Sequence, residues 1–373
     1  MQVLNTTLVL GPYDWDAEVM PRTEFDARVA AVRRTLAAHE ANALLVYGDT
    51  FDNGALSYLT NFTPKLNAAL ALFPCEGKPV ILFSGGPAIV EASQRMTWVD
   101  DLRAIGQLKA NFEQLFDGIA GGRELVLGVW ETGRMAAKSY RALQTALQGR
   151  GRMIEVQDDL EKLRRRKSPC ELAAMRRASK ILSGTTEHLK SEFDGKTGAR
   201  TLALAAERAA FSLGAQDARV MTSLREGGAP APVDTAADIC FDPLLVSIAV
   251  RFEGYYAEGH LTLTHKPLPV AEAANAGMQA MIRAARAGVS GGALAHAADQ
   301  ALNSAKARRV EVSCVGVGLS LEEAPWPSEQ ASLEAGDVCC FKVEAGSADE
   351  ASADTRALAS AMVLVGENGA EVL

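Results

Sequence analysis

The sequence has no apolar run long enough to cross a membrane. A transmembrane helix needs about 18 or more largely apolar residues, and no stretch of this 373-residue chain approaches that length. The first residues, Met1 to Asn5, also lack the basic start and the long apolar centre of a secretion signal. We therefore expect a cytoplasmic protein without a membrane partner.

Paired cysteine motifs are also missing. The six cysteines are scattered through apolar segments, and none of them stands in a C-x-x-C motif. Structural zinc sites and disulfide frameworks both depend on closely spaced or regularly patterned cysteines. We expect reduced and mostly buried thiols, with neither disulfides nor structural zinc.

Basic residues are too few for a nucleic-acid partner. The chain holds 38 Lys and Arg against 46 Asp and Glu, a formal net charge of −8. Binding of phosphates needs a clustered excess of positive charge. The one dense basic run, 164–167, follows Asp158, Asp159 and Glu161, which favours a solvated helix end over a binding patch.

The length suits two domains, which we place at residues 1–157 and 158–373. The first alternates helix and strand signals, as an α/β domain does. Thr23 is a candidate cap for its first helix. Four short apolar runs predict buried strands, and helices are expected between or after them: the strands at 43–47, 69–73, 80–83 and 125–129, and the helices at 86–95 and 136–149.

The second domain opens with a strong helix start. Ser168-Pro169-Cys170-Glu171 places a capping serine, a proline at the first helical position and a glutamate at the third. Paired strands then alternate with helices, which predicts an α+β domain with the helices on one side of the sheet. The expected helices are 168–193, 199–213, 270–287 and 291–305, and the strands are 216–223, 244–252, 255–264, 311–318 and 336–344.

Four motifs of this second domain occur in a characteristic order. They are Leu160 to Arg176 around the Lys167-Ser168-Pro169 start, Phe252-Glu253-Gly254-Tyr255, Gly316-Val317-Gly318-Leu319 followed by Glu323-Ala324-Pro325, and Val363-Leu364-Val365 followed by Glu367 to Leu373. Together they resemble the creatinase, prolidase and methionine-aminopeptidase family. The resemblance implies a C-terminal pita-bread domain preceded by a creatinase-type α/β domain, and it implies a homodimer.

The resemblance also implies two divalent metals held by two Asp, one His and two Glu. Here those positions carry other residues: Ser247, Glu258, Val315, Lys342 (or Glu344, after a two-residue slip) and Ser360. Two positions that often carry a substrate-side His hold Val233 and Glu322. Hydroxyl and ammonium groups do not replace hard anionic ligands, so we expect no metal cofactor.

One hairpin gathers polar groups that remain in the cleft. A two-residue turn at Glu253-Gly254 places Ala249 opposite Glu258 and Ser247 opposite His260. Strand alternation then puts Ser247, Glu258 and His260 on one face. His260 is either a general acid/base, since its ordinary pKa is near 6.5, or a satisfied polar residue of the strand.

Other candidates are open to two interpretations. Lys342 and Glu344 share a strand face and form either a buried ion pair or a substrate anchor and base. Cys314 fits a small buried thiol better than a nucleophile. The full set of candidates is His260, Glu258, Glu322 and Glu344 as catalytic residues and Lys342, Ser247, Glu323 and Arg225 as substrate-binding residues. We expect Glu258, His260, Glu322, Lys342 and Glu344 to converge around one pocket.

Three functions fit the sequence. The first is a metal-independent hydrolase or lyase that acts by acid/base catalysis on a C–N bond of a small molecule or short peptide, such as an amide, peptide or guanidino-like group. Creatinase, in the family that the chain resembles, breaks a C–N bond in this way. The alternatives are a catalytically inactive pita-bread binding protein and, with less support, a metal-dependent Xaa-Pro aminopeptidase.

Overall fold

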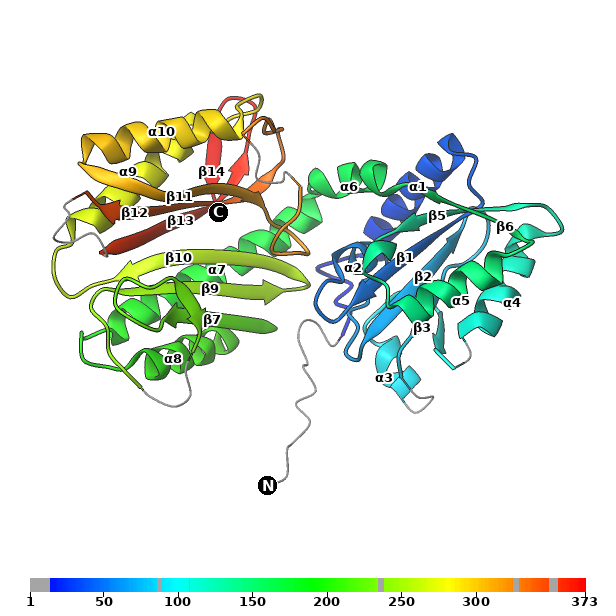
Figure 1. Cartoon of the computed structure of the whole chain (residues 1–373). Coiled ribbons are helices and arrows are strands. Elements are labelled where there is room, and N and C mark those ends of the chain that lie inside the picture. Colours follow the sequence, from blue (N-terminus) through cyan, green and yellow to red (C-terminus); the bar gives the residue numbers. More distant parts are fainter. Residues whose placement is uncertain (1–13, 86–88, 107, 234–237, 325–328, 349–354) are drawn as a thin grey trace, which may run out of the picture. The chain divides into compact units, whose positions relative to one another are not determined.

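The computed structural model describes residues 14–85, 89–106, 108–233, 238–324, 329–348 and 355–373, and it divides into two compact units (Figure 1). Unit 1 comprises residues 1–164 and unit 2 comprises residues 165–373. The boundary falls between Arg164 and Arg165, within one helix and seven residues past the expected one. Among the described residues, no helix is both long and apolar enough to cross a membrane.

Unit 1 is an α/β domain built on a six-stranded mixed sheet in the order β4-β3-β2-β1-β5-β6. Its apolar core contains Phe112 and Phe116, whose rings stack on each other. The strands are β1 (Ala43–Asp49), β2 (Ala68–Pro74), β3 (Val80–Phe83), β4 (Asp101–Ala104), β5 (Leu125–Trp130) and β6 (Gly151–Glu155); the helices are α1 (Arg22–Ala38), α2 (Gly54–Thr60), α3 (Val90–Gln94), α4 (Leu108–Ala120), α5 (Ala137–Leu147) and α6 (Gln157–Arg165), with a 3₁₀ turn, η2, at Thr132–Arg134.

Two helix starts test the capping predictions. Ser168 and Glu171 form the predicted capping box at the start of α7. The prediction for Thr23 is wrong, because α1 begins at Arg22 after an extended Pro21 and the cap makes no side-chain hydrogen bond. Of the helix expected at 86–95, α3 covers Val90–Gln94, and residues 86–88 lie outside the described part of the chain.

Unit 2 carries an eight-stranded antiparallel sheet in the order β11-β12-β13-β10-β9-β7-β8, with β14 paired to β13. Its helices come in two pairs, visible beside the sheet in Figure 1. The helices are α7 (Pro169–Glu192), α8 (Ala199–Ser212), α9 (Pro269–Ala284) and α10 (Gly291–Ser304); the strands are β7 (Asp217–Ser223), β8 (Pro230–Pro232), β9 (Leu244–Phe252), β10 (Tyr255–Leu263), β11 (Ala307–Gly316), β12 (Val338–Ser347), β13 (Arg356–Val365) and β14 (Ala370–Val372).

Both helix pairs cover the same face of this sheet, as predicted. A Cβ atom added to Gly259 of β10 would lie 3.3 Å from Leu182 of α7. Ala359 of β13 packs into the core formed with α9 and α10, and it is the register partner of Leu261 on β10. Gly259, Leu261 and Ala359 therefore point toward the helices, and their strand neighbours point toward the opposite, helix-free face.

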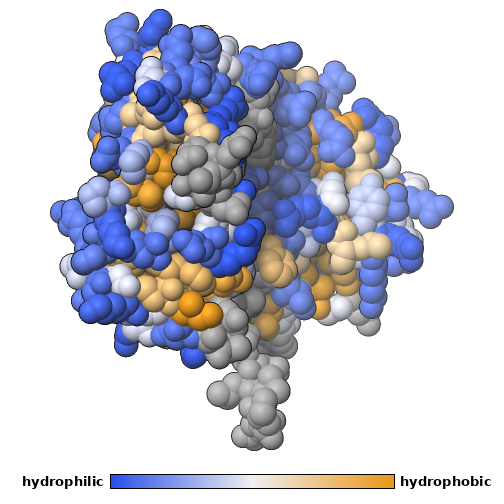
Figure 2. All heavy atoms as spheres, turned by 60° about the vertical axis from the view of Figure 1, so that its left-hand side comes forward, coloured by the Kyte–Doolittle hydropathy of each residue, from blue (hydrophilic) through white to orange (hydrophobic). Residues whose placement is uncertain are grey.

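One face of the chain is mostly polar. Figure 2 shows hydrophilic residues over most of the face in view, with smaller hydrophobic areas between them. Large hydrophobic side chains that are exposed include Phe51 in unit 1 and Leu204 and Phe211 on α8 in unit 2.

Candidate active site

The candidate site lies on the helix-free face of the unit 2 sheet and is built on the β9–β10 hairpin. Glu253 and Gly254 both have positive φ, at 45° and 84°, as a tight two-residue hairpin turn requires. The register confirms the prediction: Ala249 is paired with Glu258 and Ser247 with His260.

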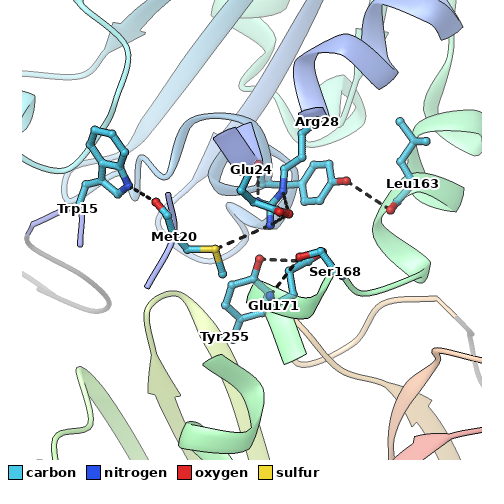
Figure 3. A network of polar contacts seen from close by, with 9 residues as sticks. Trp15, Met20, Glu24, Arg28, Leu163, Ser168, Glu171 and Tyr255 are labelled. Carbon is cyan, nitrogen blue, oxygen red and sulfur yellow. Dashed lines mark hydrogen bonds and ion pairs between the residues drawn. The ribbon is translucent and has the colours of Figure 1, made fainter. Parts of the chain in front are cut away.

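The hairpin is anchored to the start of α7. The Tyr255 hydroxyl donates a 3.0 Å hydrogen bond to Glu171, the carboxylate of the capping box (Figure 3). A second contact within unit 2 is a buried ion pair, in which Lys167 Nζ and Glu323 Oε1 are 2.5 Å apart. These contacts fix the segment before α7 to the hairpin and to the loop after β11.

Ser247, His260 and Glu258 come together as expected. Ser247 Oγ and His260 Nδ1 are 2.7 Å apart, which is a short hydrogen bond. His260 Nε2 lies 3.8 Å from Glu258 Oε2, too far for a hydrogen bond but close enough for one after a small movement. The His260 and Glu258 side chains keep 16% and 18% of their surface exposed, so neither is fully enclosed.

The pKa values of the two titratable groups move in opposite directions. Burial raises the pKa of Glu258 to about 7, against the opposing effects of the Cys340 thiol and the Lys342 ammonium. Burial and then Lys342 lower the pKa of His260 to about 4. Between these values the imidazole is neutral while the carboxyl group is protonated. A neutral base and a protonated acid therefore stand side by side.

Two further side chains complete this cluster: Cys340, which the sequence did not point to, and Ser360, which the family resemblance places at a metal position. Cys340 of β12 is buried, and its Sγ lies 3.9 Å from the Glu258 carbonyl oxygen. Ser360 of β13 accepts a 2.6 Å hydrogen bond from the His260 N–H and donates a 3.2 Å bond to the His260 carbonyl oxygen. Cys340 stands two residues before Lys342 on the same strand, so strand alternation was the signal that could have found it.

Lys342 and Glu344 do not pair with each other, so the ion-pair interpretation is wrong. Lys342 Nζ lies 2.9 Å from Glu311, and Arg356 lies 3.1 Å from Glu344. The reason is the register, because residues two apart on one strand each meet a closer partner on a neighbouring strand. Lys342 is the direct register partner of Ser360.

The remaining candidates differ in their exposure and in the groups that they contact. Glu322 is exposed, and its charge raises the pKa of Glu258. Glu323 is committed to the buried pair with Lys167. Arg225 is exposed in a turn closed by the Gly228 N–H donating to its carbonyl oxygen. Glu344 is turned toward Arg356.

A cavity of about 400 Å³ lies between α7 and α9 and borders the central strands β10 and β13. Residues 258–262 and 358–362 border it, but the side chains of Glu258 and His260 belong to the opposite face of the sheet. Glu322, Lys342 and Glu344 are not among its lining residues. This cavity therefore lies on the other face from the polar cluster. On the face of the cluster, Lys342 acts electrostatically on both Glu258 and His260, and Glu322 acts on Glu258, whereas Glu344 is paired with Arg356. The expected convergence of the five candidates around one pocket stays a prediction.

No curated protein matches this sequence. Residues 173–367 match the sequence profile of metallopeptidase family M24. The chain belongs to this family. M24 membership and the two-unit architecture confirm the predicted pita-bread domain and its α/β N-terminal domain.

Solved M24-like structures share the fold over nearly the whole chain. The prolidase from Pyrococcus horikoshii OT3 has a TM-score of 0.76 at 16% identity, with 93% of this chain and 97% of that chain covered. The Xaa-Pro dipeptidase from Bacillus anthracis has a TM-score of 0.73 at 18% identity, with 93% of this chain and 97% of that chain covered. His354Ala Escherichia coli aminopeptidase P gives 0.74 at 15%, covering 94% of each chain. At these identities the likeness establishes the fold.

The residues that the family resemblance aligns with the five metal positions do not fit two divalent cations. The Ser247 hydroxyl is bonded to His260, and the Ser360 hydroxyl is bonded to the His260 backbone. Val315 offers no donor atom, and Lys342 brings a positive charge that is already paired with Glu311. Glu258 is then the one carboxylate of the set, and in the alternative alignment Glu344 is a second, but it is paired with Arg356. The two hydroxyls and the alkyl group cannot supply the remaining ligands of such a site.

Three side chains, Glu258 among them, could in principle hold a single cation. Among the described residues, Glu258, His260 and Cys340 form one group whose donor atoms all lie within 4.8 Å of one another. The positive charge of Lys342 acts on each of these three groups, so it would repel a cation held there. Burial also raises the pKa of Cys340 well above its ordinary value, which disfavours the thiolate that a metal would require.

Proposed function

We propose that this M24 protein cleaves a C–N bond in a small molecule or short peptide by acid/base catalysis, without the two metals of its family. His260 acts as the base and Glu258 as the acid that protonates the departing nitrogen. One observation carries the proposal. A neutral imidazole bonded to Ser247 lies 3.8 Å from a carboxyl group whose pKa is raised to about 7.

The cluster supplies what such a reaction needs. A base must be deprotonated and an acid protonated at the same pH, and the two pKa values provide that condition between about 4 and about 7. Lys342 brings a positive charge that acts on both groups and would favour a substrate carboxylate or a developing oxyanion. Glu322 and Arg225 are exposed and would contact substrate at the outer edge of the site.

The relatives suggest which substrates to try first. They are named prolidase, Xaa-Pro dipeptidase and aminopeptidase P. We carry over only the bond type, so the first panel contains Xaa-Pro dipeptides, other short amides and guanidino compounds. A homodimer in the cytoplasm remains part of the proposal.

Metal analysis combined with turnover tests this function. Protein purified without added salts should contain well under one equivalent of Mn, Co, Zn or Fe, and a chelator should leave turnover unchanged. His260→Gln should reduce turnover by about 10²-fold or more, since general-base catalysis contributes about that much. Near-stoichiometric metal, together with Xaa-Pro hydrolysis that the chelator abolishes, would refute the proposal.

A binding protein without catalysis is the second candidate, and one observation favours it. Val315 and Val233 replace polar family positions with alkyl groups, as a binding surface permits. The two functions differ in how the cluster affects stability. If it is structural, His260→Gln and Glu258→Gln should each lower the free energy of unfolding by several kcal/mol, as breaking a buried polar network does, and no substrate in the panel should turn over.

A further inference from the structure

Ser247 is placed as a reactive group. Among the described residues its hydroxyl has one hydrogen-bond partner, His260 Nδ1 at 2.7 Å. Its direct register partner across β9 and β10 is the same histidine. The hydroxyl therefore faces a nitrogen that can take its proton, and the backbone of two paired strands fixes the alignment.

The second ring nitrogen of His260, Nε2, faces the carboxyl group of Glu258. His260 Nε2 lies 3.8 Å from Glu258 Oε2. If Nε2 carries the imidazole proton, Nδ1 is left with the lone pair that accepts the Ser247 proton. A small closing movement would let the carbonyl oxygen of the protonated Glu258 carboxyl group accept a hydrogen bond from Nε2–H, which favours this tautomer. In serine hydrolases an ionised carboxylate accepts the corresponding bond, from the other ring nitrogen.

We propose that Ser247 is a covalent nucleophile, activated by His260, that forms an acyl-enzyme with an amide or ester substrate. This inference rests on the proposed function and gives its chemistry a definite form. It replaces a scheme in which Ser247 merely orients His260 and water attacks directly.

The reaction balances in two halves. In the first, Ser247 Oγ forms a bond to the substrate carbonyl carbon and its proton passes to His260, and the C–N bond breaks as Glu258 gives its proton to the leaving nitrogen. In the second, water attacks the acyl carbon and gives a proton to the Glu258 carboxylate, and the C–O bond to Ser247 breaks as the serine oxygen takes back the proton from His260. The sum is amide plus water giving acid plus amine. Lys342 lies within electrostatic reach of His260 and would stabilise the negative oxygen of each intermediate.

A small activated ester gives the most direct test, because Ser247 is only 6% exposed and an acetyl group is compact. We would incubate the whole protein with p-nitrophenyl acetate near pH 6, quench it, and locate the acetyl group by peptide mass mapping. The expected result is one acetyl group on Ser247, lost in Ser247→Ala and formed at least about 10²-fold more slowly in His260→Gln.

Ser313→Ala is the matched control. Ser313 lies on β11 as the register partner of Lys342, so it is a serine on the same sheet face without an imidazole partner. The control should be acetylated on Ser247 at the wild-type rate. If Ser247→Ala does not fold, Ser247→Cys keeps the size of the side chain and should carry the acetyl group as a thioester that neutral hydroxylamine cleaves.

The outcomes separate this inference from the proposed function. Acetyl groups on lysines alone, or equal acetylation of Ser247→Ala and wild type, would overturn the nucleophile. If Ser247→Ala also retains amide turnover that His260→Gln loses, water is the attacking group and the proposed function stands without the inference. If neither substitution changes turnover, both proposals fail.

Discussion

His260 and Glu258 hold the pH dependence of the proposed activity, because their pKa values lie on either side of weakly acidic pH. The base needs a neutral His260, which is present above about pH 4, and the acid needs a protonated Glu258, which is present below about pH 7. We expect turnover to follow a bell-shaped curve with its maximum between these values. Glu258→Gln should lower turnover and remove the alkaline limb, and kcat/KM measured from pH 3.5 to 8.5 checks this. An alkaline limb that persists in Glu258→Gln would assign it to another group.

The same two residues have opposite effects on stability. The folded chain keeps the Glu258 proton to about pH 7, whereas the unfolded chain loses it near 4.5, so the contribution of Glu258 is present below 4.5 and is lost as pH rises to 7. The unfolded chain protonates His260 near pH 6.5 and the folded chain only near 4, so its contribution is present above 6.5 and is lost as pH falls to 4. Between pH 4.5 and 6.5 the two contributions to the unfolding free energy change with pH in opposite directions and cancel.

Single substitutions should separate these slopes. Between pH 4.5 and 6.5 the unfolding free energy of Glu258→Gln should rise with pH by about 2 kcal/mol, whereas that of His260→Gln should fall by about as much. Urea unfolding at three pH values checks this, and comparing the two variants cancels the contributions of all other groups. Cys340, Lys342 and Glu322 next to Glu258, and Lys342 and Glu311 next to His260, remain in both variants. If the unfolding free energies of the two variants changed with pH in the same direction, the opposite pKa shifts of Glu258 and His260 would be contradicted.

The hairpin residues could be predicted from the sequence, and their neighbours could not. Ser247 and His260 are paired by a two-residue turn, which local sequence determines. Cys340 contacts Glu258 from a strand about 80 residues further along the chain, and Ser360 contacts His260 from a strand about 100 residues further along. The register of these strands depends on tertiary packing. The same dependence made the Lys342 and Glu344 pairing wrong.

At the scale of elements, β10 and β13 share the fewest register pairs of any neighbouring strands described in unit 2. One residue pair, Leu261 with Ala359, is in register there. Two hydroxyls on either side join the strands: Ser360 bonds the N–H and carbonyl of His260, and Thr262 bonds the N–H and carbonyl of Leu358. Side chains thus replace backbone ladder bonds where the two halves of the sheet meet.

Removing either hydroxyl should therefore destabilise the chain. Ser360→Ala or Thr262→Val leaves a backbone N–H without its partner, at a cost of about 1–3 kcal/mol in unfolding free energy. Chemical denaturation at one pH measures this. Ser313→Ala, whose hydroxyl makes no hydrogen bond among the described residues, should change the value by less than about 0.5 kcal/mol. Losses no larger than that of Ser313→Ala would show that the backbone alone holds the junction.

Element prediction succeeded where the signal was local. The capping box at Ser168 depends on four consecutive residues and is present. Helix α2 was missed because all seven of its residues are buried, so it lacks the alternation of apolar and polar faces that reveals a helix in a sequence. The cap predicted at Thr23 lies two positions too late, since Pro21 is the N-cap of α1.

At the scale of the whole molecule, the resemblance to creatinase-type proteins implies a homodimer in which the N-terminal domain of one chain closes the cleft of the other. We therefore expect light scattering to give twice the 39.6 kDa chain mass at micromolar concentration, with more than about 1,000 Å² buried at the interface. Phe51, in the loop after β1 of unit 1, is 81% exposed in the single chain, and burial of such a side chain contributes about 1.5–3 kcal/mol.

We assign Phe51 to this interface because it is the most exposed large hydrophobic side chain among the described residues. Phe51→Glu should then weaken the dimer by about tenfold or more, because it removes that burial and places a charge in the interface. Leu204→Glu is the matched control. Leu204 is also exposed, at 46%, but it lies on α8, which packs against the helix-covered side of the sheet and away from the Ser247 and His260 face. The control should therefore dimerise normally. A monomeric wild-type chain would exclude the shared cleft, and dimer loss in Leu204→Glu alone would place the interface on the helices instead.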